Sequence, residues 1–172
     1  IFFGFGLGNA MGMAIAIYHI LAHGLTKSCL FLSVSSFIEQ TGFREIDKMR
    51  GIGREMPITL AIFSLGGLSM VGIPMLPGFV SKWNLALAAI ERGQIFLLLI
   101  ILASSLLNVS YYFPIIINGY FGNSNLEGKI YKSKMKPVKE LVPLILLSVM
   151  MVLVGFGSGP ILDWIASAIP SL

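Results

Sequence analysis

Residues 57–90 read PITLAIFSLGGLSMVGIPMLPGFVSKWNLALAAI, and this stretch decides the fold. It contains two apolar runs with an interruption between them, at residues 72–78. The interruption holds four residues that disfavour a continuous helix: Gly72, Pro74, Pro77 and Gly78. Since a membrane-spanning helix needs about 20 predominantly apolar residues, the stretch is either one spanning helix with a break or two crossings joined by a turn.

The charges of the flanking loops separate these two possibilities. With one crossing, loops 39–56 and 122–140 share a side and together carry nine Lys and Arg residues, against Arg92 alone opposite. With two crossings, the same residues divide five against five. Short cytoplasmic loops normally carry a strong excess of Lys and Arg. We therefore predict one discontinuous helix, with both long loops cytoplasmic. Because irregular backbone at membrane depth needs a protein or water-filled surrounding, the break also predicts a polar cavity.

The remainder of the chain is equally apolar. Of its 172 residues, 56% are hydrophobic and 12% charged, whereas soluble domains average about 25% charged. Further apolar segments lie at about 1–8, 11–38, 95–121 and 141–157. These features predict an all-α polytopic protein, integral to a prokaryotic cell membrane, and exclude a soluble domain with one anchor. The excess of basic residues lies in loops, so we expect contact with lipid and no nucleic-acid partner.

We divide the chain into three parts. Residues 1–121 form a repeat of helices (1–8, 11–38, 57–90 broken at 72–78, and 95–121), residues 122–140 a basic linker, and residues 141–172 a last spanning helix with an interfacial tail. The chain begins at Ile1, inside an apolar run, and we expect it to be a fragment of a longer protein.

Three basic side chains lie inside the apolar segment 11–38. His19, His23 and Lys27 are four residues apart, which places them on one helix face with a rise of about 6 Å between neighbours. A charged side chain at bilayer depth costs on the order of 3 kcal/mol, and histidine readily exchanges a proton near neutral pH. The spacing therefore predicts a proton relay.

Two other interpretations of these residues stay open. Lys27 could extend to a nearby interface while the histidines bond to neighbouring helices. Two histidines at i and i+4 could also bind zinc, but Ile20 stands where the usual protease motif has glutamate, and no third ligand is near. We expect no metal site.

A fourth basic residue, Lys82, follows the interruption directly in the sequence Gly78-Phe79-Val80-Ser81-Lys82-Trp83. It lies about one turn into the second half-helix, where the positive end of the helix dipole and burial both disfavour the ammonium form. We expect this lysine to release its proton readily, as a gated proton carrier requires. A lysine that only locks helices together through a carboxylate is the alternative, but no acidic residue of the spanning segments can pair with it.

Segment 95–121 carries further polar residues, and most of these are expected to pack and hydrogen-bond between helices. The candidates for lining a channel are Ser104, Ser105, Asn108 and Tyr111.

Four motifs together resemble the antiporter-like proton-translocating subunits of respiratory complex I, of Mrp-type cation/proton antiporters and of energy-converting hydrogenases. They are His19-x3-His23-x3-Lys27, residues 51–57 (GIGREMP), residues 72–83 (GIPMLPGFVSKW) and residues 104–112 (SSLLNVSYY). The resemblance covers residues 1–121. One departure is that family members usually have two prolines where this chain has Pro74-Met75.

The resemblance implies a full-length subunit of about fourteen helices with two inverted five-helix repeats, each with one broken helix. This chain would be most of the second repeat and the last helix. His19, His23 and Lys27 would then be relay residues of the central axis, and Lys82 the terminal lysine of a half-channel.

The function expected from this resemblance is translocation of protons, or exchange of Na+ for protons, with other membrane subunits as partners. We expect no bound cofactor and no catalytic site in the chain itself, which would serve a redox-driven pump or an antiporter. A structural subunit whose buried charges only stabilise assembly is the alternative. Direct reduction of a quinone is disfavoured because the sequence has one cysteine and no cofactor motif.

Overall fold

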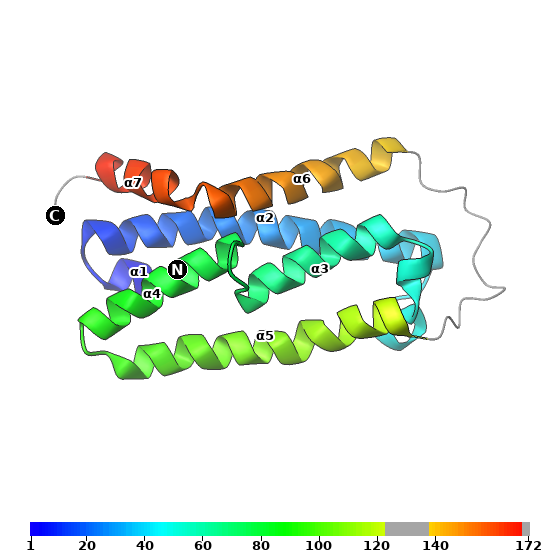
Figure 1. Cartoon of the computed structure of the whole chain (residues 1–172), viewed down its shortest axis with the longest axis horizontal. Coiled ribbons are helices and arrows are strands. Elements are labelled where there is room, and N and C mark those ends of the chain that lie inside the picture. The colour runs from blue at the N-terminus through cyan, green and yellow to red at the C-terminus, as the bar shows by residue number, and fades with distance from the viewer. Residues whose placement is uncertain (123–137, 170–172) are drawn as a thin grey trace.

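The structure is a computed structural model that describes residues 1–122 and 138–169. All its regular elements are helices (Figure 1). In chain order they are α1 (Phe2–Gly6), α2 (Ala10–Thr41), the 3-10 turns η1 (Ile46–Met49) and η2 (Ile52–Arg54), α3 (Pro57–Val71), α4 (Pro77–Glu91), α5 (Ile95–Phe121), α6 (Val138–Phe156) and α7 (Ser158–Ala168). The chain is thus the all-α membrane protein with a discontinuous helix that the sequence predicts. The expected basic linker lies largely outside the described residues.

Helix α2 is the axis of the bundle. It packs against α1, α3, α4, α6 and α7, and its 32 residues extend for about 48 Å at 1.5 Å each. It begins at Asn9, whose side chain accepts a hydrogen bond from the amide of Gly12 at 2.8 Å. It ends at Gly42, whose positive φ of 70° forms a left-handed C-cap. Within the described residues, α2 and α5 are each long and apolar enough to cross a membrane, by length and composition.

Helices α3 and α4 follow one another in the same direction alongside α2 and α5 (Figure 1). Residues 72–76 interrupt the helix, and Pro77 and Gly78 already belong to the first turn of α4. At the far end of α3, the Gly51 amide donates to the Asn118 carbonyl at 2.9 Å. Loop 42–56 and the end of α5 therefore lie at the same end of the bundle. This is the arrangement of a single discontinuous crossing.

A second bend lies between α6 and α7, which meet at 76°. Gly157 separates the two helices, and Pro160 lacks the amide that would continue the ladder of α6. Near this bend the Tyr18 hydroxyl of α2 donates a hydrogen bond to the Val154 carbonyl of α6 at 3.0 Å. The sequence predicted one last spanning helix with an interfacial tail, and this bend differs from that prediction.

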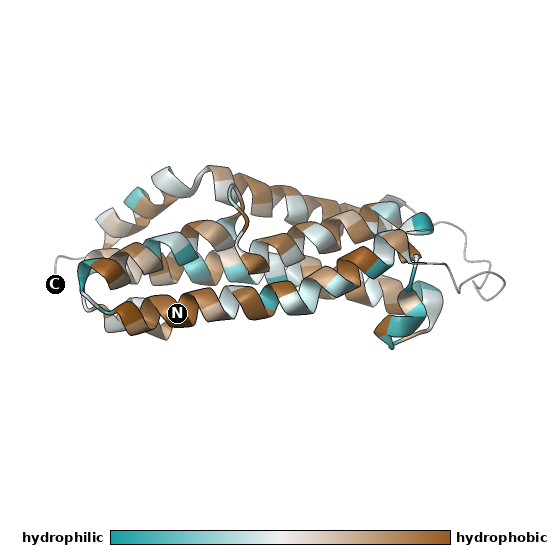
Figure 2. Cartoon of the chain, turned by 60° about the horizontal axis from the view of Figure 1, so that its bottom comes forward, coloured by the Kyte–Doolittle hydropathy of each residue, from teal (hydrophilic) through white to brown (hydrophobic). Residues whose placement is uncertain are grey.

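Apolar residues dominate the long helices, and polar residues collect at the loop ends (Figure 2). Between the helices, apolar clusters hold α2 against its neighbours. One joins Leu30 and Phe37 of α2 to Phe63 of α3 and Tyr112 of α5. Another buries Cys29 against α3 and α6. Midway along the bundle, beside the break, polar side chains line a cavity between the helices.

Candidate functional site

The ammonium of Lys82 lies at the carboxyl end of α3. Its Nζ donates to the carbonyl oxygens of Met70 at 2.7 Å and Val71 at 3.2 Å, and to Ser105 Oγ at 2.9 Å. Side chains of a helix lean toward its N-terminus, so a lysine one turn inside α4 reaches back across the break. The last carbonyls of α3 have no helical donor because the chain leaves the helix at Gly72. Lys82 supplies the missing donor.

The helix dipole that acts on the Lys82 charge differs from the one expected from the sequence. The expectation rested on α4, whose positive end lies near Lys82. The side chain instead brings its charge to the C-terminus of α3, where the partial negative charge of the helix favours a cation. The described partners of Lys82 are neutral oxygens. Two ion pairs are found in the described residues, and both lie in loop 42–56: Lys48–Glu45 and Arg50–Asp47.

Helix α5 provides the other wall of the site. Ser105 accepts the bond from Lys82, and Asn108 Nδ2 donates to the Met70 carbonyl at 3.1 Å. Ser104 and Asn108 line the cavity that also contains Lys82. Tyr111 does not line it.

His19 reaches the same site from α2. Its Nδ1 lies 2.8 Å from the Oγ of Ser81, the residue before Lys82. The His19 and His23 rings stack with their centroids 5.7 Å apart. Both rings line the cavity of about 170 Å³ beside Lys82. The fold therefore brings together His19 and His23 with Lys82, about sixty residues further along the chain.

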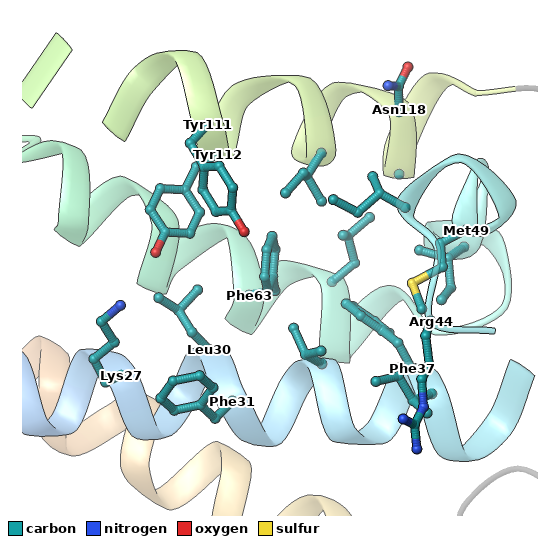
Figure 3. Close-up of a pocket in the computed structure, with 17 residues that line it drawn as sticks. Lys27, Leu30, Phe31, Phe37, Arg44, Met49, Phe63, Tyr111, Tyr112 and Asn118 are labelled. Carbon is teal, nitrogen blue, oxygen red and sulfur yellow. The ribbon is translucent and has the colours of Figure 1, made fainter. Parts of the chain in front are cut away.

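Lys27 belongs to a different cavity. Its Nζ lies 5.7 Å from the centroid of the Phe31 ring, and it lines a larger, mostly apolar pocket of about 480 Å³ between α2, α3 and α5. Figure 3 shows Lys27 and the pair Tyr111 and Tyr112 pointing into this pocket from opposite sides. The three basic residues share a helix face, but that face meets two separate cavities along its length.

Three buried hydroxyls near the break were not singled out from the sequence: Thr26, Ser69 and Ser81. Thr26 Oγ1 lies 3.1 Å from Ser69 Oγ, and Ser69 Oγ accepts from the Gly78 amide at 3.3 Å. These bonds tie α2, α3 and the first turn of α4 together. The available signal was the presence of hydroxyl residues within apolar helix runs that flank a break.

The predicted break residues take distinct roles. Gly72 ends α3 with φ of 98°, a value that side chains rarely tolerate. Pro77 starts α4 at its first position, where proline needs no amide donor. A Cβ on Gly78 would overlap the Ser69 carbonyl, so only glycine lets α4 approach α3 this closely. Pro74 lies in the turn between the helices. Beside it, Met75 has φ of 74°.

Together the fold and site define a polytopic membrane protein with ionisable residues gathered at a broken helix. A sequence profile described as NADH:quinone oxidoreductase/Mrp antiporter, transmembrane, matches residues 1–108. The chain belongs to this family of proton-antiporter-like membrane subunits.

Three relatives illustrate the breadth of the family. The chain is 32% identical to NADH-quinone oxidoreductase subunit N of Desulforudis audaxviator, over 88% of this chain and 32% of the relative. It is 30% identical to a Na(+)/H(+) antiporter subunit of Alkalihalophilus pseudofirmus, over 94% of this chain and 32% of the relative. The Mrp complex of Dietzia sp. contains a chain of the same fold, with a TM-score of 0.82 and 20% identity over 96% of this chain and 38% of that one. This chain thus spans about a third of the length of these two curated relatives.

Proposed function

We propose that this chain conducts protons through part of the membrane, as one segment of an antiporter-like subunit in a multisubunit complex. The observation that carries the proposal is the 2.8 Å contact between His19 of the axis helix and Ser81 beside Lys82. It joins His19 of α2 to a hydroxyl of α4 that is next in the sequence to Lys82. His19 and Lys82 both line the cavity at the break between α3 and α4.

The proposed path runs from the stacked histidines to the break. His23 and His19 adjoin within the cavity, Ser81 Oγ bridges to α4, and Lys82 connects through Ser105 toward α5. The neutral imidazoles, the hydroxyls and cavity water can each accept one proton while releasing another, whereas the Lys82 ammonium must release a proton before its amine accepts the next. A chain of these groups would carry a net proton. Lys27 and the tyrosines of the second pocket would extend this path toward loop 42–56.

The relatives indicate which partners and ions to propose for this chain. They are subunits of a quinone oxidoreductase and of a cation/proton antiporter, so we propose other membrane subunits as partners and protons or Na+ as the transported ions. We also propose a prokaryotic inner membrane as the location, with residues 39–56 and 122–140 on its cytoplasmic side, because their Lys and Arg residues favour that side. A partner module would supply the driving energy.

A second candidate function is structural. Every N–H donor of Lys82 has an oxygen acceptor, and these bonds connect α4 to α3 and α5. A lysine in such a position would also hold three helices together without moving a proton.

The variant Lys82→Ala distinguishes the two functions. In membrane vesicles containing the complete complex, we expect proton translocation to fall at least tenfold while the amount of assembled complex on native gels stays close to wild type. Lys48→Ala is the matched control, since Lys48 is an exposed loop lysine paired with Glu45, and it should change neither quantity. Normal pumping by the Lys82→Ala complex would refute the proposed function, and loss of assembly would favour the structural one.

A further inference from the structure

A mostly apolar cavity of about 480 Å³ lies between α2, α3 and α5 (Figure 3). Aromatic and aliphatic side chains form most of its wall, and a basic side chain stands at each end, Lys27 at one and Arg44 at the other. Its volume falls within the range of about 300–1,000 Å³ that is usual for small-molecule sites. We call this cavity, with Phe37, Phe63 and Tyr112 in its wall, the Lys27 pocket.

The Lys27 pocket is long and open to the outer surface of the helices. Within the described residues, α5 packs against α3 and α4 and has little contact with α2, which leaves a gap along the bundle. On α2 the lining extends from Lys27 to Ile38, a rise of about 16 Å at 1.5 Å per residue. Two lining residues, Phe31 and Tyr111, are 69% and 60% exposed. A ligand can therefore enter sideways, from the hydrocarbon of the membrane.

The dimensions of the pocket fit an acyl chain better than a helix. One leaflet of the hydrocarbon core is about 15 Å deep, half of about 30 Å, which matches the length of the lining. Divided over that length, the volume gives a mean cross-section of about 30 Å². A helix is about 10–12 Å wide with its side chains, so it would rest on the rim and leave the pocket unfilled.

The charge of the lining favours an anion. No carboxylate among the described residues lines the Lys27 pocket. An adjoining open cavity shares Arg44 with it and contains Glu39, so the two cavities together hold two basic side chains and one acidic one. Arg44 is exposed and belongs to neither of the two ion pairs of the described residues. The positive excess attracts an anionic ligand with an apolar body.

The two basic ends of the pocket differ in depth. Arg44 lies in loop 42–56, at the end of the bundle, whereas Lys27 lies about 21 Å along α2 from its last residue, Thr41. A phosphate buried at the level of Lys27 would lose its hydration, which is costly at bilayer depth. The planar guanidinium of arginine also binds phosphate through two parallel hydrogen bonds. We therefore expect an anionic headgroup at Arg44 and the chain toward Lys27.

We propose that the Lys27 pocket binds one acyl chain of an anionic phospholipid, whose phosphate pairs with Arg44 at the membrane interface. The lipid comes from the leaflet that meets loop 42–56, and its chain fills the gap between α2 and α5. The chain packs against Phe37 and Phe63 and ends near Lys27. Because it occupies only the apolar part of the pocket, it leaves Lys27 and the tyrosine hydroxyls to the proposed proton path.

The test is photo-crosslinking of the complete complex in vesicles of phosphatidylcholine. The probe is phosphatidylglycerol with a diazirine in its acyl chain, added in increasing amounts. On illumination we expect it to label residues 27–38 of α2 and residues 111–119 of α5 in a saturable manner. Phosphatidylcholine with the same diazirine chain should label these two segments several-fold less.

Two matched pairs of variants separate the headgroup from the chain. Arg44→Gln should raise the phosphatidylglycerol content for half-maximal labelling about fivefold, and Arg92→Gln, at an exposed residue of the opposite end of the bundle, should leave it unchanged (Figure 1). Val34→Trp should block labelling because the indole fills the pocket. Leu32→Trp, at an exposed residue of α2 outside the lining, should not.

Three results would overturn the proposal. Equal labelling by the two lipids, with an Arg44→Gln complex that behaves as wild type, would exclude an anionic headgroup. Stronger labelling by a fatty acid with the same diazirine chain would assign the pocket to a carboxylate held by Lys27. Labelling of neither segment would show that other helices of the complex cover the pocket. The proton path is tested separately, by Lys82→Ala, and does not depend on the lipid.

Discussion

His19 Nδ1 and Ser81 Oγ lie 2.8 Å apart, although 62 residues separate them in the chain. Ser81 is fully buried and also lies within hydrogen-bonding distance of the Pro77 and Gly78 carbonyls, at 3.4 and 3.2 Å. When its hydroxyl donates to a carbonyl, His19 must donate from Nδ1 and its Nε2 is left free to accept a proton. In this arrangement Ser81 determines the tautomer of His19, with the proton on Nδ1.

The first prediction concerns this hydroxyl. Ser81→Ala should slow proton translocation by the assembled complex about tenfold, because His19 loses the partner that fixes its ring and its tautomer. Ser81→Thr keeps a hydroxyl on the same carbon and should restore most of the rate. Both variants should assemble, since one hydrogen bond between membrane helices contributes only about 0.6 kcal/mol. Equal rates for the alanine and threonine variants would exclude a role for the hydroxyl.

The second prediction concerns the closest approach of α4 to α3. Gly78→Ala would place its Cβ in the Ser69 carbonyl, which is backbone and cannot move aside. We expect a loss of about 1–3 kcal/mol in stability, seen as a lower unfolding temperature of the complex in detergent. Gly24→Ala is the control, because a Cβ at Gly24 of α2 meets nothing within 4 Å. If the Gly78→Ala and Gly24→Ala complexes had the same unfolding temperature, α3 and α4 would be able to move apart here at no cost in stability.

The sequence predicted the helices and the break well because both depend on local chemistry. Long apolar runs in lipid form helices because a helix satisfies its own backbone groups. The glycines and prolines of residues 72–78 interrupt the helix at their own positions. The loop charges correctly favoured a single crossing for the same reason: orientation depends on where Lys and Arg fall along the chain.

The site was harder to predict because it depends on which helices become neighbours. A hydroxyl within an apolar helix usually bonds to its own backbone, as Ser64 does with the Leu60 carbonyl. Only their position beside the break distinguished Ser69 and Ser81 from Ser64. In the same way, the regular spacing of His19, His23 and Lys27 could not show that Lys27 meets a different cavity.

The third prediction follows from the backbone of the break. Met75 adopts φ of 74°, in the left-handed region that costs a side chain on the order of 1 kcal/mol. Met75→Gly should raise the unfolding temperature of the complex. Met75→Pro should lower it, because proline holds φ near about −65° and would force the turn onto another path. Family members with two prolines at these positions would then differ in this turn. If Met75→Pro were as stable as wild type, the turn would be free to change conformation.

The fourth prediction concerns Gly155, where α6 approaches the break. A Cβ there would overlap the Met75 carbonyl and lie 3.1 Å from Pro77 Cδ and N, so the absence of a side chain lets α6 rest against the turn. Gly155→Ala should push α6 and the turn apart, which shifts Pro77 and the start of α4 that carries Ser81 and Lys82. We expect both a lower unfolding temperature and slower proton translocation. Gly159→Ala in α7 is the matched control, since a Cβ there meets nothing within 4 Å. If Gly155→Ala lowered stability without slowing translocation, α6 would support the break without positioning the residues of the proton path.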